Sequence, residues 1–542
     1  MEVLEIGTIE LYLSVKPPTM LYNAQEVMRS AAKEANNPRL VETSEEVLDN
    51  IRAYCPAYMN DGLAAAALLS DVTRRAQSCV STMDPGERGR YAHALYQFYD
   101  LETTPGEASA SRPKNALSYI HSLGADCEKI ELTARQYREN YENSDPTMVE
   151  AVRSNEDVAI SAETWAQELH KICTPQQMLD VLKITNVEAV MIKAAKMLQL
   201  LTASLDTMST VSDVHSLHRA HEADFFYAPL LEVLGLDEWA AALKDKARLL
   251  RLYKAGDTES VAIAVETTDY AESLKSEIVD KLLPGAVFAT VHGKVGAYSR
   301  MGELDGVDLG EVKPLKVQHR TKSYGSMAYK LAEYRRKLFP KEAIPSDAIG
   351  LNIITNTWED AANALRQIYE QAMIIEGMEL SDSPTNGQGH SILFSAPEEI
   401  SAVLKNSMDD TGVRVNGRQT EAKGYKTFKI YLNYKGVSIE VQCLTSDAHD
   451  ANRFGEGAHG FKSAEDLGDE VRAKQAEQTR EVHGRMGRLA VHGGGNGAEY
   501  EINGQSLENS YYSFATNIDN GYRHANKTEH VEKYQQRIVS ST

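Results

Sequence analysis

The pattern of hydrophobic positions changes near residue 255. Before that point, apolar residues recur every three or four positions over long stretches, a spacing that predicts helices. The candidate helices lie near 23–35, 44–53, 61–80, 88–99, 128–141, 160–171, 174–183, 187–206, 213–233 and 237–253. From about 258 onward, helical patterns alternate with short apolar runs typical of strands. The sequence therefore predicts a multidomain chain with an all-α N-terminal half and an α/β part that contains a mixed sheet.

The second part has fewer and shorter elements. We expect helices near 268–283, 359–375 and 397–408, and strands near 286–291, 346–354 and 390–394. The remaining stretches predict a glycine-rich insertion and two polar loops, at 293–312, 381–389 and 409–423.

The clearest pattern is a β-hairpin over residues 424–442. Two runs that alternate apolar and polar residues are joined by a Lys-Gly pair, which favours a two-residue turn. With such a turn, Tyr431 faces Glu440 and Lys429 faces Gln442 on the polar side of the hairpin. That side is either an ordinary solvated face or a rigid platform for chemistry.

Composition narrows the class of protein. A chain of 542 residues is too long for a single hydrophobic core, so we expect two or three domains. Its content of 42% hydrophobic and 25% charged residues is typical of a globular protein. A net charge of −21 weighs against broad nucleic-acid binding. The five cysteines have neither metal nor disulfide spacing, which suits a reducing compartment. No apolar run is long enough for a bilayer and the start lacks a signal-peptide pattern, so we expect a cytoplasmic protein without membrane contact.

Several short motifs follow one another between residues 320 and 459. They are Arg320-Thr-Lys322-Ser-Tyr-Gly-Ser326-Met-Ala-Tyr-Lys330, then Ser346-Asp347, Gly424-Tyr425-Lys-Thr-Phe-Lys429, Glu440-Val-Gln442, His449 and Gly455-Glu-Gly-Ala-His459. In this order and spacing they resemble the synthetase domain of RelA/SpoT-type alarmone synthetases. The resemblance implies a nucleotidyltransferase-like fold. It also implies transfer of pyrophosphate from ATP to the ribose 3′-hydroxyl of GDP or GTP, which makes the alarmone (p)ppGpp.

The resemblance also implies roles for individual residues. Asp347 and Glu440 would hold Mg²⁺, and Glu440 would accept the hydroxyl proton. ATP would be bound by Arg320, Lys322, Ser326 and Lys330, and the acceptor nucleotide by Tyr425, Lys429, Gln442, His449 and His459. Chemically, a guanidinium can stack on adenine, and ammonium groups on one helical face can neutralise a triphosphate. The alternatives are a basic helix with a solvated face and, at Ser346-Asp347, ordinary turn chemistry. The run at 293–299 resembles the same ATP-binding pattern only with a gap, and it is the second candidate for the ATP site.

The helical half resembles the hydrolase domain of the same family, with departures. Ser70 stands where that family has a metal-binding His, and Lys196 where it has a metal-binding Asp. Because a lysine repels a divalent cation, we expect a hydrolase fold that has lost its activity; an unrelated helical domain is the alternative. The expected domains are a helical pseudo-hydrolase, a helical linker, the synthetase and a C-terminal extension of unknown role, over 1–210, 211–257, 258–463 and 464–542.

Three departures also concern the synthetase part. Asn352 and Leu444 replace arginines of the family, and Lys429 replaces a histidine. They leave three hypotheses: an alarmone synthetase acting on ATP and a guanine nucleotide, a pyrophosphokinase with an adenine nucleotide or the tRNA 3′ end as acceptor, and a nucleotide-binding pseudoenzyme. The chain is too short for the family's regulatory domains, so ribosome sensing is not expected. Oligomeric state stays open.

Overall fold

The described part of the chain holds most of the predicted elements. The computed structural model describes residues 20–34, 36–56, 59, 61–77, 123–124, 126–136, 138, 178, 181–182, 185–206, 213–289, 301–310, 312–336, 345–381, 391–395, 398–418 and 426–454. The predicted helices at 88–99 and 160–171 lie outside these ranges. Among the described helices, none combines the length and apolar character that a membrane crossing requires.

The described residues divide into two compact units. The first contains α1 (Met20–Glu34), the start of α2 (Arg39–Tyr54) and α3 (Asp61–Gln77), and α1 packs against α3. The apolar run of α3 is fully buried from Leu63 to Leu69, whereas Ser70 and Asp71 are half-buried. The prediction of a core helix here is confirmed.

Between residues 187 and 254 the helices of the second unit match the predicted ranges with one interruption. α9 (Val187–Asp206) and α12 (Asp237–Lys254) begin where predicted. The helix predicted at 213–233 is broken into three pieces: α10 (Asp213–Glu222), a π-helical turn (Ala223–Tyr227) and α11 (Ala228–Val233). The cause is Pro229, which has no backbone N–H to donate. It lies in the first turn of α11, where an N–H has no partner inside the helix, so α11 loses no hydrogen bond.

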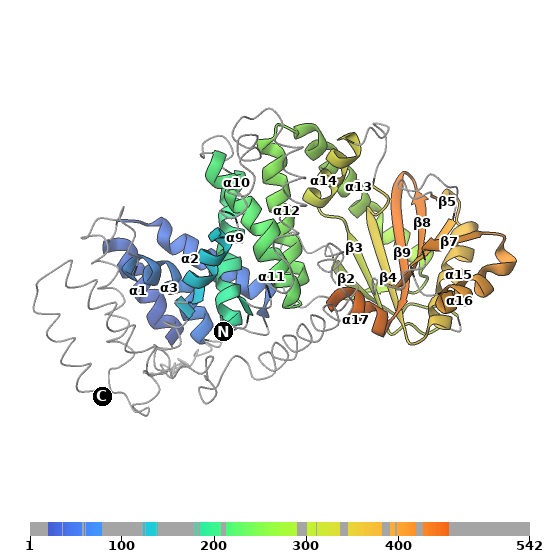
Figure 1. Ribbon diagram of the computed structural model, residues 1–542, viewed down its shortest axis with the longest axis horizontal. Helices are drawn as coiled ribbons and strands as arrows, with labels where there is room; N and C mark the ends of the chain where they lie inside the picture. Colours follow the sequence, from blue (N-terminus) through green and yellow to red (C-terminus); the bar gives the residue numbers. More distant parts are fainter. Residues whose placement is uncertain are drawn as a thin grey trace, which may run out of the picture. The chain divides into compact units, whose positions relative to one another are not determined.

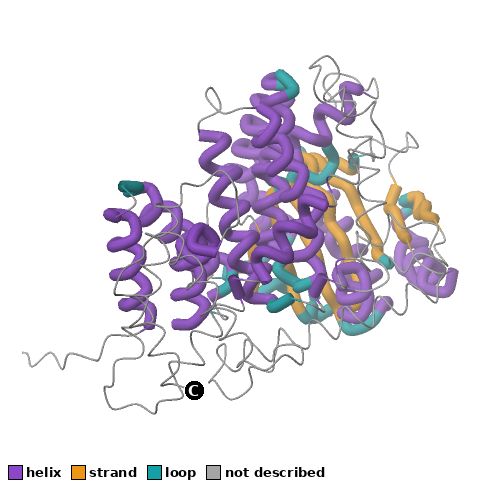
Figure 2. The backbone as a smooth tube through the Cα atoms, turned by 60° about the vertical axis from the view of Figure 1, so that its left-hand side comes forward, coloured by secondary structure: helices purple, strands orange, loops and turns teal. Residues whose placement is uncertain are grey.

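Within the described residues of the second unit, nine strands form one mixed sheet. The order is β1-β2-β3-β4-β9-β8-β6-β7, and β5 pairs with β8. β4 and β9 are parallel, as are β6 and β7, whereas the other pairs are antiparallel. Figure 1 labels the central strands side by side, and Figure 2 shows the strands beside the helices. The bounds are β1 Val287–Phe288, β2 Met301–Asp305, β3 Lys316–Thr321, β4 Ile349–Thr355, β5 Met378–Leu380, β6 Ser391–Ser395, β7 Arg414–Arg418, β8 Thr427–Tyr434 and β9 Val437–Thr445.

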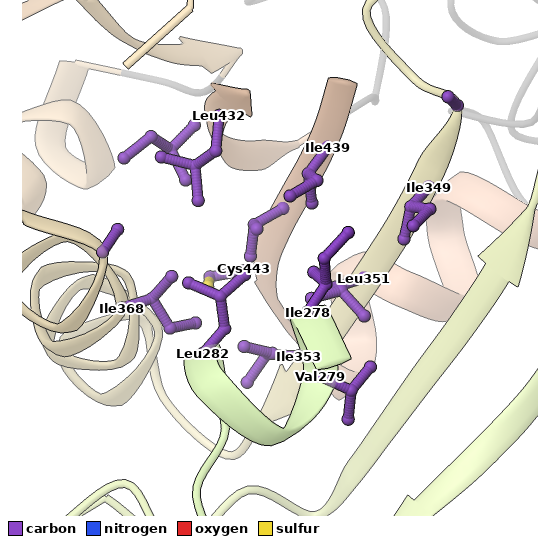
Figure 3. Close-up of a cluster of buried hydrophobic side chains, with 14 of the residues drawn as sticks. Ile278, Val279, Leu282, Ile349, Leu351, Ile353, Ile368, Leu432, Ile439 and Cys443 are labelled. Atoms are coloured by element: carbon purple, nitrogen blue, oxygen red, sulfur yellow. The ribbon is translucent and has the colours of Figure 1, made fainter. Parts of the chain in front are cut away.

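The core lies on one face of this sheet. Helices α13 (Thr258–Leu282) and α15 (Trp358–Ile374) supply apolar side chains that meet those of the central strands. Burial of each such side chain contributes about 1.5–3 kcal/mol. Figure 3 labels ten members of this buried apolar cluster: Ile278, Val279, Leu282, Ile349, Leu351, Ile353, Ile368, Leu432, Ile439 and Cys443. Because side chains alternate along a strand, the intervening residues lie on the opposite face.

Three predictions in this part need correction. α13 begins at Thr258 rather than near 268, because the Asp257 side chain accepts a hydrogen bond from the Ser260 N–H and caps the helix. β2 lies inside the predicted glycine-rich insertion, and β7 inside the predicted loop at 409–423. Both strands contain glycine and few apolar residues, so they carry little periodic signal. The helix at 397–408 is confirmed as α16 (Glu398–Met408).

Candidate functional site

A row of residues crosses the face of the sheet that lies opposite the core. Arg320 on β3 is paired with Gly350 on β4, Gly350 with Glu440 on β9, and Glu440 with Tyr431 on β8. These strands lie side by side in Figure 1. The predicted facing of Tyr431 and Glu440 is thereby confirmed.

A second row runs alongside the first on the same face. It contains Gln318, Asn352, Gln442 and Lys429, in the same strand order. The predicted facing of Lys429 and Gln442 is confirmed as well. Lys435 and Gly436 form the expected two-residue turn, with φ of 51° and 83°. The turn fixes the register and therefore brings the two rows together.

The carboxylate of Glu440 is buried, with 6% of the residue exposed. Its Oε1 accepts hydrogen bonds from Lys429 Nζ at 2.7 Å and from Gln442 Nε2 at 2.6 Å. Burial raises the pKa of Glu440, but the charges of Lys429 and Arg320 outweigh burial and hold the pKa below its ordinary value. Glu440 is therefore an anion at neutral pH, and at this position the hairpin does not have a solvated face.

Asp347 lies in the turn just before β4 and is also buried, with 5% exposed. Its carboxylate accepts hydrogen bonds from Lys322 Nζ at 2.6 Å and from Lys330 Nζ at 3.0 Å. Burial raises the pKa of Asp347, yet the two ammonium groups outweigh it and hold the pKa well below its usual range. In the opposite sense, the pKa of Lys322 is lowered to about 7, chiefly because burial disfavours its charge; the charge of Asp347 raises this pKa, and the charges of Lys330 and Arg320 lower it.

The predicted ATP-binding residues do not all lie on one helical face. Arg320 belongs to β3 and Lys322 follows it, with its N–H bonded to the Ala348 carbonyl at 2.9 Å. Only Ser326 and Lys330 lie on α14 (Tyr324–Arg336). The expectation of one helical face is wrong because the chain turns between Thr321 and Tyr324. The structure nevertheless brings Lys322 and Lys330 onto one carboxylate.

Ser326 has a neighbour that sequence reasoning missed. Arg248 on α12 donates from Nη1 to Ser326 Oγ at 3.1 Å. The same guanidinium lies 5.2 Å from the ring centre of Tyr329, and its Nε lies 3.5 Å from Asp224 Oδ2. No pattern in the sequence links residues 248 and 326, because the contact depends on how α12 and α14 pack. Helix α12 thus reaches the predicted ATP-binding helix.

The structure describes three of the five predicted acceptor-binding residues. Lys429 and Gln442 meet at Glu440, as described above. His449 lies half-buried on α17 (Ser446–Phe454), which packs against β9 and β4. Tyr425 and His459 lie outside the described residues.

Leu444 stands where the resembled family has an arginine, and its surroundings give a local reason for an apolar residue. Leu444 is 3% exposed and packs with Ile354 and Ala448 in a small apolar cluster under α17. An arginine there would lose its hydration without a partner in that cluster. Nothing in the structure explains Asn352 in the same way.

The two carboxylates suit a magnesium ion that arrives with nucleotide phosphates. Mg²⁺ is commonly held by one or two carboxylates together with substrate phosphate oxygens. Glu440 is paired with Gly350, three residues after Asp347, and the charge of Asp347 raises the pKa of Glu440, after the larger effects of burial, Lys429 and Arg320. Within the described ranges, no cluster of three or more His, Cys, Asp or Glu side chains could hold a metal by itself. The residues therefore fit Mg²⁺ only as a site that phosphates complete.

The two departures from the hydrolase pattern lie on different helices. Ser70 lies on α3, with Thr73, Arg74 and Arg75 in the following turn of the same helix. Lys196 lies on α9, where burial lowers its pKa to about 8. A side chain of this kind is a cation or a neutral amine, and neither replaces a carboxylate ligand.

Comparison with protein-family models found no match for the chain. Comparison with curated proteins found no match either. The family resemblance therefore continues to rest on the motifs themselves.

Proposed function

We propose that this chain is an alarmone synthetase, which transfers the pyrophosphate of ATP to the ribose 3′-hydroxyl of GDP or GTP, and that its helical half is a pseudo-hydrolase. The observation that carries the proposal is the meeting of two buried carboxylates with four cations from separate segments. Asp347 meets Lys322 and Lys330, and Glu440 meets Lys429, with Arg320 near both.

The charges support chemistry on a triphosphate. Phosphoryl transfer depends mainly on positioning and on cations that stabilise the charge building on the transferred phosphates. Arg320 on β3, Lys322 just after β3 and Lys330 on α14 supply such cations, in a protein whose net charge is −21. Each is paired with Asp347 in the free protein, and a triphosphate would offer each more negative charge.

In this proposal Glu440 takes the proton of the 3′-hydroxyl. The hydroxyl oxygen then bonds to the β-phosphorus of ATP, and the bond from that phosphorus to the α-phosphate oxygen breaks, so that AMP leaves with the electron pair. Mg²⁺, when held by Asp347, Glu440 and the phosphates, would neutralise charge on the phosphates. Lys429 and Gln442 orient the Glu440 carboxylate through their two hydrogen bonds to Oε1.

Lys429 supports a second candidate, a pyrophosphokinase with another acceptor. Its ammonium donates a hydrogen bond to Glu440 at 2.7 Å, and the resembled family has a histidine at this position. In this second candidate the ammonium faces the acceptor. A cation there favours an acceptor that presents phosphate at that position. An adenine nucleotide or the tRNA 3′ end would be such an acceptor, although the net charge of −21 weighs against tRNA.

The testing experiment incubates the protein with γ-labelled ATP and Mg²⁺ in separate reactions. Each reaction contains one acceptor: GDP, GTP, AMP, ATP or bulk tRNA. Glu440→Gln is the matched control, because the amide keeps the size of the side chain and loses the base. We expect labelled guanosine tetra- or pentaphosphate, with a roughly 10²–10⁴-fold loss in the variant and retained ATP binding. Label on another acceptor would establish the second candidate. Binding without transfer to any acceptor would leave the pseudoenzyme.

A further inference from the structure

The Arg320 side chain crosses β4 directly over Gly350. A Cβ atom added to Gly350 would lie 2.9 Å from Arg320 Nε and 3.0 Å from Arg320 Cγ. Such distances are shorter than ordinary non-bonded contacts. Gly350 is an extended residue within β4, so its missing side chain, rather than its backbone, makes the crossing possible.

The crossing brings the guanidinium toward both carboxylates of the site. Arg320 Nη2 lies 4.0 Å from Asp347 Oδ2, and Glu440 is the residue paired with Gly350 on the next strand. Burial raises the pKa of each carboxyl and the neighbouring lysines lower it; the Arg320 charge lowers it further in both. Arg320 thus acts electrostatically on both acids.

We propose that Gly350 is a positioning residue: the space above it lets Arg320 lie across the sheet as the shared counter-ion of Asp347 and Glu440. The geometry stands without a ligand, whereas the consequence for nucleotide binding rests on the proposed function. An arginine held in this place faces the position where phosphates would meet the two carboxylates. A methyl group at residue 350 would force the Arg320 side chain to shift from this path over the strand.

The fold should tolerate this methyl group. The atoms that it would displace belong to a long side chain that is 45% exposed, and none belongs to the backbone. A strand residue also prefers alanine to glycine, because glycine loses more conformational freedom on folding. Gly350→Ala is therefore expected to act on the place of Arg320 and not on the folding of the sheet.

The first test needs no ligand and compares four proteins: the unchanged chain, Gly350→Ala, Arg320→Ala and the double variant. Arg320 Nη2 lies 4.0 Å from the buried carboxylate of Asp347, so loss of the guanidinium leaves that carboxylate with one cation fewer. The midpoint of urea unfolding, followed by circular dichroism near neutral pH, should therefore move to a lower urea concentration in each single variant.

The double variant decides whether Gly350 acts through Arg320. Its midpoint should equal that of Arg320→Ala, because the methyl group then has no guanidinium to displace. Its thermal unfolding temperature should equal or exceed that of Arg320→Ala. Additive midpoint shifts, an unchanged midpoint in Gly350→Ala, or a double variant that fails to fold would each overturn the inference.

The second test measures Mg²⁺-ATP binding by calorimetry in the same four proteins. Each single variant should bind roughly tenfold or more weakly, and the double variant no more weakly than Arg320→Ala. If the unchanged chain binds no ATP while the shifts of the urea midpoint are non-additive, the proposed function fails and the positioning of Arg320 stands. If ATP binds and is transferred while both cycles are additive, the function stands and the role of Gly350 falls.

Discussion

Lys429 Nζ lies 2.7 Å from Glu440 Oε1, although the residue paired with Lys429 across the hairpin is Gln442. The lysine therefore reaches diagonally to the carboxylate of the neighbouring row. The pair is nearly buried, with 20% of the Lys429 side chain and 7% of the Glu440 side chain exposed. A buried carboxylate with a close ammonium stays ionised but becomes a weaker base. The residue that departs from the resembled family thus acts on the expected base.

We expect Lys429→Met to shift the acid limb of transfer activity to higher pH. Loss of the ammonium leaves burial to raise the pKa of Glu440, so its carboxylate becomes protonated at a higher pH than in the unchanged chain. Activity that needs the ionised carboxylate is then lost earlier as the pH falls. The measurement is the pH dependence of kcat/KM for the acceptor that the labelling experiment identifies.

Lys435→Met is the control for this variant. Lys435 belongs to the same hairpin, but its ammonium pairs with Glu277 at 2.9 Å instead of Glu440. Removing one charge from the turn should leave the acid limb in place. Equal shifts in both variants would mean that net charge, and not the contact with Glu440, sets the limb.

Lys322 gives a prediction about stability at alkaline pH. Its folded pKa is about 7 and its unfolded value is 10.5, so between these values the unfolded chain binds more protons than the folded chain. Stability due to this group therefore rises with pH across that window. Lys322→Met lacks the titrating group. The measurement is the free energy of unfolding in urea, for both proteins, at pH 7 and near pH 9.5. From the lower to the higher pH it should rise by more in the unchanged chain than in the variant.

Asp347 does not disturb that comparison, because its pKa lies well below the window. A difference between the two proteins that is constant from pH 7 to pH 9.5 would contradict the lowered pKa of Lys322.

The hairpin could be predicted from sequence because its signals are local. Alternation fixes which side chains share a face, and Lys435-Gly436 fixes the register, so the opposition of Tyr431 and Glu440 followed from counting residues. The direction of the Lys429 side chain could not be counted in this way. It depends on a rotamer choice that the charge of Glu440 decides in the folded protein.

Contacts between distant segments were beyond the same reasoning. The motif from Arg320 to Lys330 predicted a cluster of cations but placed them on one helix, because a strand end followed by a turn gives no periodic signal. The bond from Arg248 to Ser326 arises only when α12 packs on α14. Motif order identified most of the candidate residues, and tertiary packing decided which of them meet.

The turn itself provides a test of the register. Gly436 has φ of 83°, in the left-handed region that residues with a Cβ atom avoid at a cost of roughly 1–2 kcal/mol. Gly436→Ala should lower the free energy of unfolding in urea by about that amount. Because nothing lies within 4 Å of an added Cβ, the cost would come from the backbone alone. An unchanged stability would show that the turn adopts another conformation in solution.

The last prediction concerns the start of α14. Asp245 on α12 accepts a hydrogen bond from the N–H of Gly325, one of the N–H groups that have no partner inside their own helix. Asp245 is fully buried, so water does not replace the bond when the carboxylate is removed. Asp245→Ala should therefore cost about 1–3 kcal/mol of unfolding free energy and weaken ATP binding, because Ser326 and Lys330 lie on this helix.

Asp245→Asn is the matched variant, since its amide oxygen still accepts the bond at nearly the same size. It should retain more of the stability and more of the ATP affinity than Asp245→Ala. If the alanine variant loses stability but binds ATP with unchanged affinity, α14 does not carry the nucleotide site. If both variants lose stability equally, the negative charge rather than the hydrogen bond stabilises the helix start, as the helix dipole would allow.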